Sequence, residues 1–162
     1  MKVLYAKTCA ERRPEYRQVT LIIEENGRRA ARKQALGPEG CVHVNAYAEN
    51  NEKLQQAIRK GSGIRILDCV RLGDGIVEFP YLEEETLAER MRGMGPDAYA
   101  RELVSFREML TDAFGTVPFR MTRGYRAVFG DAALADGRCC LGITNLDMNP
   151  DNVFLNADGS RT

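Results

Sequence analysis

An Asn-Gly pair at residues 26–27 is the sequence feature that most constrains the fold of this chain. It separates two runs, residues 19–23 and 29–35, and the first is rich in β-branched side chains. Asn-Gly between extended runs favours a tight hairpin, because both residues tolerate the positive φ of a type I′ turn. A further extended run, residues 3–7, precedes this hairpin. The N-terminal part is therefore predicted to be an antiparallel meander of three strands.

After the meander the pattern changes to that of a helix and then returns to strands. Apolar residues at helical spacing predict a helix over residues 42–59, which glycines at 61 and 63 end. Residues 64–70 and 75–79 predict two further strands, joined by a turn. The order therefore predicts a five-stranded antiparallel sheet with one helix inserted after the third strand.

The rest of the chain is predicted to be mainly helical. Helices are expected at residues 86–94 and 96–114. An irregular stretch follows at residues 115–138, and extended segments are expected at residues 140–144 and 153–155. The predicted fold class is therefore α+β.

Residues 145–155, Asn-Leu-Asp-Met-Asn-Pro-Asp-Asn-Val-Phe-Leu, carry the most informative chemistry. Asp147 precedes Asn152 by five positions, with a proline between them and an apolar run after them. This pattern resembles the catalytic loop of the protein kinase-like superfamily, in particular its divergent bacterial branch of small-molecule, lipopolysaccharide-core and aminoglycoside kinases. The resemblance implies that Asp147 is the catalytic base and that Asn152 binds magnesium. On the residues alone, the alternative is an Asp-rich turn that bonds its own backbone.

The resemblance also implies a protein kinase-like fold, in which a five-stranded N-lobe sheet with one helix is followed by an incomplete helical C-lobe. The N-lobe and hinge would take residues 1–82 and the partial C-lobe residues 83–162. Lys33, on the third strand, would contact the α- and β-phosphates. Its partner from the helix would be Glu49, at the edge of the apolar stripe, and not Glu52, which points away. The simpler interpretations are a solvated strand lysine and a surface charge on a helix.

Residues 75–87 are similar to the hinge of this family and the start of its next helix. By that similarity Phe79 would guard the back of an adenine pocket. Pro80 would offer adenine its carbonyl, and Leu82 its carbonyl and N–H. The implied cofactors are ATP and Mg²⁺. An edge strand that runs into an acidic helix start is the alternative interpretation.

Two elements of the family are missing. The connection at residues 8–17 contains no glycine, whereas the family places a glycine-rich loop over the phosphates there. Three arginine side chains are the candidate substitutes: Arg12, Arg13 and Arg17. The second metal-binding aspartate is expected just beyond Thr162. We therefore expect little or no transferase activity from these residues, and association through apolar surface at residues 140–155.

The expected function of the full-length form is ATP- and magnesium-dependent phosphorylation of a hydroxyl group on a small molecule or glycan. The alternative is a non-catalytic pseudokinase module for binding or regulation. The missing glycine-rich loop supports it, as does Asn145, which stands where the family has histidine or its equivalent. A third interpretation is an α+β domain unrelated to kinases, in which Lys33 and Asp147 would lie far apart.

Composition argues against several other classes. The 23 Lys and Arg residues balance 23 Asp and Glu residues, which argues against a nucleic-acid binder. Residues 1–33 nevertheless hold nine Lys and Arg against four Asp and Glu. No apolar run approaches the ~20 residues of a membrane span. Five cysteines and one histidine indicate neither a disulfide framework nor a metal cluster, so we expect reduced, mostly buried thiols and a cytoplasmic location.

Overall fold

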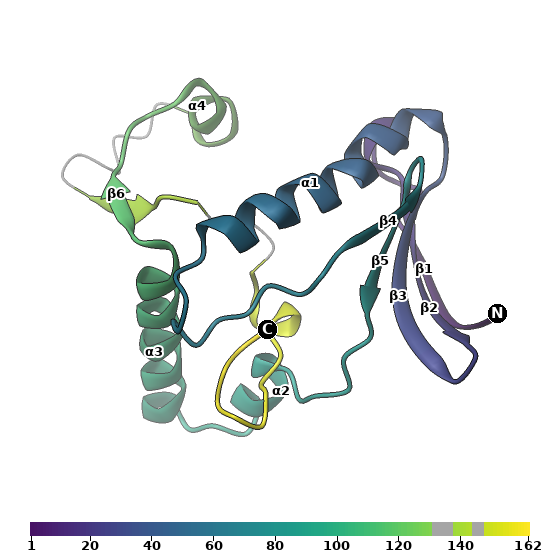
Figure 1. Cartoon of the computed structure of the whole chain (residues 1–162). Coiled ribbons are helices and arrows are strands. Elements are labelled where there is room, and N and C mark those ends of the chain that lie inside the picture. Colours follow the sequence, from purple (N-terminus) through teal and green to yellow (C-terminus); the bar gives the residue numbers. More distant parts are fainter. Residues whose placement is uncertain (131–137, 144–147) are drawn as a thin grey trace.

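A five-stranded antiparallel sheet forms the N-terminal part of the protein. The computed structural model describes residues 1–130, 138–143 and 148–162. The strand order is β1-β2-β3-β5-β4 (Figure 1). The five strands are β1 (Lys2–Thr8), β2 (Gln18–Glu25), β3 (Arg28–Ala35), β4 (Val70–Gly73) and β5 (Ile76–Pro80). The predicted α+β class and five-stranded antiparallel sheet are confirmed.

The meander of β1, β2 and β3 is organised by the turn at Asn26 and Gly27. Their φ angles are 53° and 76°, as a tight hairpin with Asn-Gly at its centre requires. Glu25 and Arg28 pair directly across this turn, and the register then continues without a break to Gln18 and Ala35. The local chemistry of two residues thus sets which side chains of β2 and β3 share a face.

One predicted strand is displaced. The strand expected at residues 64–70 is wrong for residues 64–69, because β4 begins only at Val70. The backbone of the earlier residues is bonded elsewhere. Asn51 Nδ2 donates to the carbonyl of Leu67 at 2.7 Å, and the N–H of Arg65 donates to the carbonyl of Arg161 at 2.7 Å. These bonds replace the strand pairing that the sequence pattern predicts.

The inserted helix α1 (Cys41–Ala57) follows the one-turn helix η2 (Pro38–Gly40) and packs on β3 and β5. Figure 1 shows it extending from one face of the sheet towards the helical part of the chain. On this helix Val44 is fully buried, whereas Val42 is 80% exposed. The prediction that Val42 belongs to the buried stripe is therefore wrong, and the helix is rotated relative to that expectation.

The C-terminal part packs around a small apolar core. Its helices are α2 (Leu87–Met91), α3 (Pro96–Phe114) and α4 (Arg123–Phe129), and β6 (Thr116–Pro118) pairs with β7 (Cys139–Leu141). The core consists of Leu87, Met91, Phe106, Val153 and Leu155. The expectation that residues 140–155 present uncovered apolar surface is wrong at Val153 and Leu155, which are buried.

Helix α2 begins with a capping box that orients the chain after β5. Thr86 Oγ1 accepts from the N–H of Glu89 at 3.1 Å, and the Glu89 carboxylate accepts from the N–H of Thr86 at 2.8 Å. The donation from the Thr86 N–H, together with that from the Thr86 hydroxyl, lowers the pKa of the Glu89 carboxyl below its ordinary value. Within the described residues, no helix is long and apolar enough to cross a membrane.

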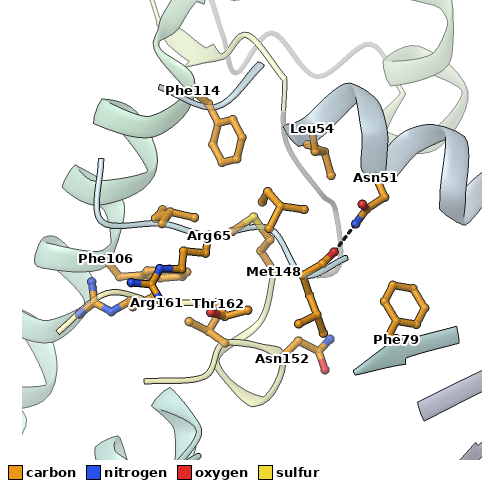
Figure 2. A pocket seen from close by; sticks show the side chains of 14 residues that line it. Asn51, Leu54, Arg65, Phe79, Phe106, Phe114, Met148, Asn152, Arg161 and Thr162 are labelled. Atoms are coloured by element: carbon orange, nitrogen blue, oxygen red, sulfur yellow. Dashed lines mark hydrogen bonds between the residues drawn. The ribbon is translucent and has the colours of Figure 1, made fainter. Parts of the chain in front are cut away.

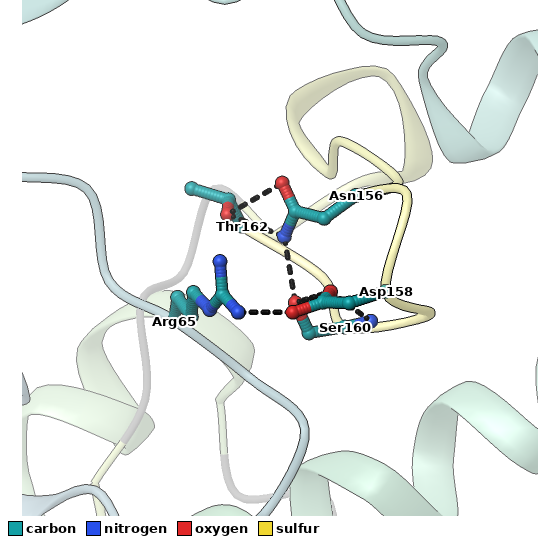
Figure 3. Close-up of polar contacts among 5 residues, drawn as sticks. All are labelled: Arg65, Asn156, Asp158, Ser160 and Thr162. Atoms are coloured by element: carbon teal, nitrogen blue, oxygen red, sulfur yellow. Dashed lines mark hydrogen bonds and ion pairs between the residues drawn. The ribbon is translucent and has the colours of Figure 1, made fainter.

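The C-terminal loop folds back against the segment that precedes β4. Arg65 forms an ion pair with Asp158, whose carboxylate also accepts from the Ser160 hydroxyl at 2.6 Å (Figure 3). Asn156 Nδ2 donates to Ser160 Oγ and to Thr162 Oγ1, each at 2.9 Å. These contacts fix the end of the chain beside residues 63–65.

The cysteines are all within the described residues, and they are free thiols. The prediction that most are buried is wrong. Cys139 and Cys140 are exposed, because β7 is paired only with β6, and Cys9, Cys41 and Cys69 are half-buried.

Candidate functional site

A cavity of about 450 Å³ lies on the face of the sheet that carries α1. Its walls come from β2, β3, β5, α1, residues 80–82 and the C-terminal residues 152 and 154. A volume in this range suits a small organic ligand. The cavity therefore lies where the sheet, the inserted helix and the C-terminal loop meet.

The strand register explains which side chains face this cavity. Ile22, Ala31 and Phe79 are directly opposite one another on β2, β3 and β5, so they lie on one face of the sheet. The next row on the same face is Thr20, Lys33 and Val77. Apolar side chains therefore form the floor of the cavity near Phe79, and the Lys33 ammonium group projects from the next row.

Five residues predicted from the sequence line this single cavity. Lys33 comes from β3, and Phe79 and Pro80 come from β5. Leu82 follows that strand, and Asn152 ends the one-turn helix η3 (Pro150–Asn152). These residues come from widely separated parts of the sequence, and the fold brings them together.

Two predicted site residues are not among them. Glu49 is exposed and does not line the cavity. It lies two positions from Tyr47, which is about 200° around an α-helix, on the side away from the sheet. The structure therefore does not bring Glu49 to Lys33. Asp147 lies outside the described residues, and its catalytic role stays a prediction.

Lys33 instead contacts aromatic rings. Its Nζ lies 4.3 Å from the centroid of Tyr47 and 5.9 Å from that of Phe79. Across the described ranges, no carboxylate forms an ion pair with Lys33. A cation over aromatic faces is stabilised by the ring quadrupole. The ammonium group thus keeps its charge available to a further anion.

Sequence reasoning missed three further residues of α1 that line the cavity. Tyr47, Asn50 and Asn51 recur at the helical spacing i, i+3, i+4, and Leu54 extends the row. The spacing was readable in the sequence. A search for an apolar stripe does not count asparagines as inward-facing, however. The predicted rotation of α1 was therefore based on its apolar residues, and it was wrong.

His43 and Tyr47 on α1 belong to a series of aromatic contacts that begins at the β1–β2 connection. Tyr16, on the one-turn helix η1 (Pro14–Tyr16), packs edge-on to His43 with centroids 5.1 Å apart. His43 contacts Tyr47 at 5.4 Å, and Tyr47 contacts Phe79 at 6.4 Å. Partial burial, together with the charges of Lys33 and Arg12, lowers the pKa of His43 below its ordinary value.

A second, smaller pocket of about 190 Å³ adjoins the first. The two share Asn51, Leu54, Leu67, Phe79 and Asn152 as lining residues. Figure 2 shows this pocket with Asn51 and Leu54 on α1 and with Phe106 and Phe114 on α3. The shared wall connects the sheet-side cavity to the helical part of the chain.

The described side chains of the cavity are a poor set of ligands for magnesium. Asn152 supplies an amide oxygen, but the described lining contains no carboxylate. The described residues also contain no group of three or more His, Cys, Asp or Glu side chains arranged to hold a metal. Magnesium sites normally use one or two carboxylates together with phosphates and water. The described residues alone do not fit a resident magnesium ion.

Comparisons with family models, with curated proteins and with solved structures find no match. Functional inference therefore rests on the residues of this chain and on their geometry.

Proposed function

We propose that this chain is a kinase-like phosphotransferase and that the cavity between the sheet and α1 holds the nucleotide. The observation that carries the proposal is the convergence of Lys33, the β5 residues Phe79 and Pro80, Leu82 and Asn152 on one cavity of about 450 Å³. The strand order β1-β2-β3-β5-β4, with the helix inserted after β3, supports the same proposal.

The chemistry of the lining suits a base attached to phosphates. Ala31, Ile22 and Phe79 provide apolar surface for a planar ring, and the backbone at Pro80 and Leu82 offers hydrogen-bonding groups beside it. Lys33 would bind the phosphates next to that ring. In this proposal the chain orients the nucleotide mainly through one cation and an apolar slot.

The proposed reaction transfers the terminal phosphoryl group of ATP to a hydroxyl on a small molecule or glycan. The acceptor oxygen forms a bond to phosphorus, the bond to ADP breaks, and Asp147 takes the hydroxyl proton. Asp147 is assigned by its resemblance to the family motif alone. Magnesium remains a prediction attached to the phosphates, and no step above depends on it.

A second candidate, a nucleotide-binding module without catalysis, is favoured by one specific observation. Lys33 packs against Tyr47 and Phe79 and makes no ion pair with a carboxylate among the residues that the structure describes. The sequence departures at the β1–β2 connection and at Asn145 point the same way. In this candidate the cavity binds nucleotide, but phosphoryl transfer does not follow.

Calorimetric titration with ATP, with and without magnesium, tests the binding site that both candidates share. Replacing the cation in Lys33→Met should raise the Kd for ATP by about 10-fold to 100-fold, as expected for a lost charge-assisted hydrogen bond. Lys60→Met is the matched control, because Lys60 is exposed and does not line the cavity. Absence of ATP binding, or equal Kd values for the wild type and Lys33→Met, would contradict the proposal.

A turnover assay separates the two candidates. We expect the 162-residue chain to bind ATP but to release little or no ADP. Robust turnover that Asp147→Ala abolishes would establish the catalytic candidate for this chain. Binding of ATP without turnover would instead support the binding module for this chain.

A further inference from the structure

The inner face of the sheet carries cations beyond Lys33. In the row that contains Lys33, Thr20 lies opposite it on β2, and Lys7 lies opposite Thr20 on β1. Cross-strand neighbours on one face are about 5 Å apart. The two lysines therefore flank a threonine hydroxyl on the same side of the sheet as the cavity.

The connection between β1 and β2 carries a further guanidinium group, that of Arg12. Two hydrogen bonds to backbone carbonyls hold its fold: Arg17 Nε donates to the carbonyl of Arg12 at 2.8 Å, and the N–H of Cys9 donates to the carbonyl of Gln18 at 2.9 Å. Arg12 acts on the charge of His43, as does Lys33. The positive charges of both side chains therefore act at the His43 ring.

His43 is the titratable member of this group. Its ring is packed between Tyr16 of η1 and Tyr47 of α1, and its nitrogens form no hydrogen bond with any described residue. Lys33 of β3 and Arg12 are the charged groups that face it. Glu39 of η2 and Arg71 of β4 act instead on the Cys41 thiol, which is also on α1.

These cations are not neutralised by the protein. Over the described residues, Lys7, Arg12 and Lys33 form no ion pair, and neither do Glu11 and Glu15 of the same connection. Elsewhere Arg32 pairs with Glu78 at 2.8 Å, and Arg90 pairs with Glu85 at 3.2 Å. An unneutralised group of cations beside a cavity favours an anionic ligand.

We propose that Lys33, Lys7, Arg12 and His43 form a polyphosphate-binding site, in which side-chain cations replace the backbone amides of a glycine-rich connection. The inference rests on the proposed nucleotide function, because it assigns the phosphate part of the same ligand. A chain of three phosphates is comparable in length with about two cross-strand spacings, so one such ligand can lie between Lys33 and Lys7, with Arg12 contributing from the connection. Protonation of His43 adds a further positive charge, so acidic pH tightens binding.

Calorimetric titration of the 162-residue chain with inorganic tripolyphosphate tests this site without the contribution of adenine. Lys7→Gln and Arg12→Gln should each raise the Kd by about 3-fold to 10-fold, and the difference should shrink at high salt. Arg101→Gln is the matched control, because Arg101 is exposed on α3 and forms no ion pair with a described residue. Both replaced residues are exposed, so their folding is checked simply by an unchanged melting temperature.

The Kd for tripolyphosphate is measured at two pH values for both the wild type and His43→Gln. The variant is the reference because tripolyphosphate itself gains protons on acidification. At pH 8 the wild type and this variant should have the same Kd. At pH 5.5 the wild type should bind about 3-fold to 10-fold more tightly than the variant, because only the wild type gains a charge. A ratio that stays constant between the two pH values would overturn the role of His43.

The outcomes distinguish this inference from the proposed function. ATP binding that is sensitive to Lys33→Met, but with no tripolyphosphate binding or no effect of Lys7→Gln and Arg12→Gln, overturns the polyphosphate site and leaves the nucleotide cavity standing. Tripolyphosphate binding with the expected variant effects, but no gain in affinity for ATP over tripolyphosphate, supports the polyphosphate site and contradicts the nucleotide proposal.

Discussion

Lys33 on β3 and Tyr47 on α1 are joined by a cation–π contact, with the ammonium nitrogen 4.3 Å from the ring centroid. This contact connects the central strand of the sheet to the inserted helix. The sequence predicted an ion pair of Lys33 with Glu49, but the ammonium group contacts an aromatic ring instead. The Lys33 charge has no counterion among the described residues.

A double-mutant cycle measures this contact. We expect a coupling free energy of about 0.5–2 kcal/mol from the urea unfolding of Lys33→Met, Tyr47→Leu and the double variant. Either single substitution already removes the cation–π attraction, so the double variant should lose less stability than the sum of the two single losses. A second cycle with Lys33→Met and Glu49→Gln serves as the control. Its coupling should be about zero, within ~0.5 kcal/mol, because Glu49 is exposed and does not line the cavity. Stronger coupling to Glu49 than to Tyr47 would contradict the observed rotation of α1.

Gly75 is predicted to tolerate no side chain. Its φ is +68°, and an added Cβ would lie 2.7 Å from Cys41 Sγ and 3.1 Å from the Cβ of Ala35. Gly75→Ala should therefore lower the free energy of unfolding by about 1–3 kcal/mol, through backbone strain and overpacking. Urea denaturation measures this loss.

Gly73→Ala provides the comparison from the same turn. A Cβ at Gly73 would meet no atom within 4 Å, and its φ is not in the left-handed region. The free energy of unfolding should change by less than about 0.5 kcal/mol. Similar losses at both glycines would show that the packing of β4 and β5 against α1 differs from the structure.

Removal of one partner of the ion pair between Arg161 and Glu102 is predicted to lower the free energy of unfolding, mainly because the other charge is left unpaired. Arg161 is 7% exposed, its guanidinium also packs on Phe106 at 5.5 Å, and its Nε has no partner among the described residues. Arg161→Met leaves the Glu102 carboxylate unpaired and should cost about 2–4 kcal/mol of unfolding free energy.

Adding Glu102→Leu to that variant should recover much of the loss, because the unpaired charge is then also removed. Chemical denaturation of the two single variants and the double variant provides the measurement. A double variant whose loss equals the sum of the single losses would indicate that the two side chains do not interact.

The Cys69 thiol is predicted to resist alkylation. Burial raises its pKa to about 11, although the charge of Lys33 acts in the opposite direction. Because the thiolate is the reactive form, Cys69 should be alkylated far more slowly at pH 8 than the exposed Cys139, and its rate should rise with pH up to about 11. Mass spectrometry after timed alkylation distinguishes the two sites.

The same shift in pKa predicts a dependence of stability on pH. The unfolded chain releases the Cys69 proton near the ordinary value of 9.0, before the folded chain does. The free energy of unfolding should therefore fall as the pH rises from about 9 to about 11. The wild type should lose more stability than Cys69→Ser over that range; equal losses would contradict the raised pKa.

The sequence predicts those parts of the fold that depend on neighbouring residues in the chain. Asn26 and Gly27 specify a tight turn by themselves, and the register of β2 and β3 follows from that turn. Lys33, Phe79 and Leu82 were found because their order along the chain matches the order of the elements that carry them. Their meeting in one cavity depends on those elements and not on any single motif.

The rotation of α1 could not be predicted in the same way. Its inward side presents Val44, Tyr47, Asn51 and Leu54, so half of that side is polar or amphipathic. A method that looks for an apolar stripe favours Val42 instead, and that choice moves Glu49 to the boundary. Packing on β3 and β5, together with the bond from Asn51 to Leu67, decides the rotation. These are long-range contacts that a single sequence does not reveal.

The bond between the Arg65 and Asp158 side chains joins residues 93 positions apart, and backbone bonds of Arg161 to Gly63 and Arg65 lie beside it. Closing so large a loop is entropically costly, whereas the hairpin of β2 and β3 closes locally. The sheet is therefore expected to form before the wall that contains Asn152. The amide of Arg161 is protected from hydrogen exchange only when the C-terminal loop has met the segment around Gly63. Its protection during refolding would therefore mark the assembly of the cavity wall.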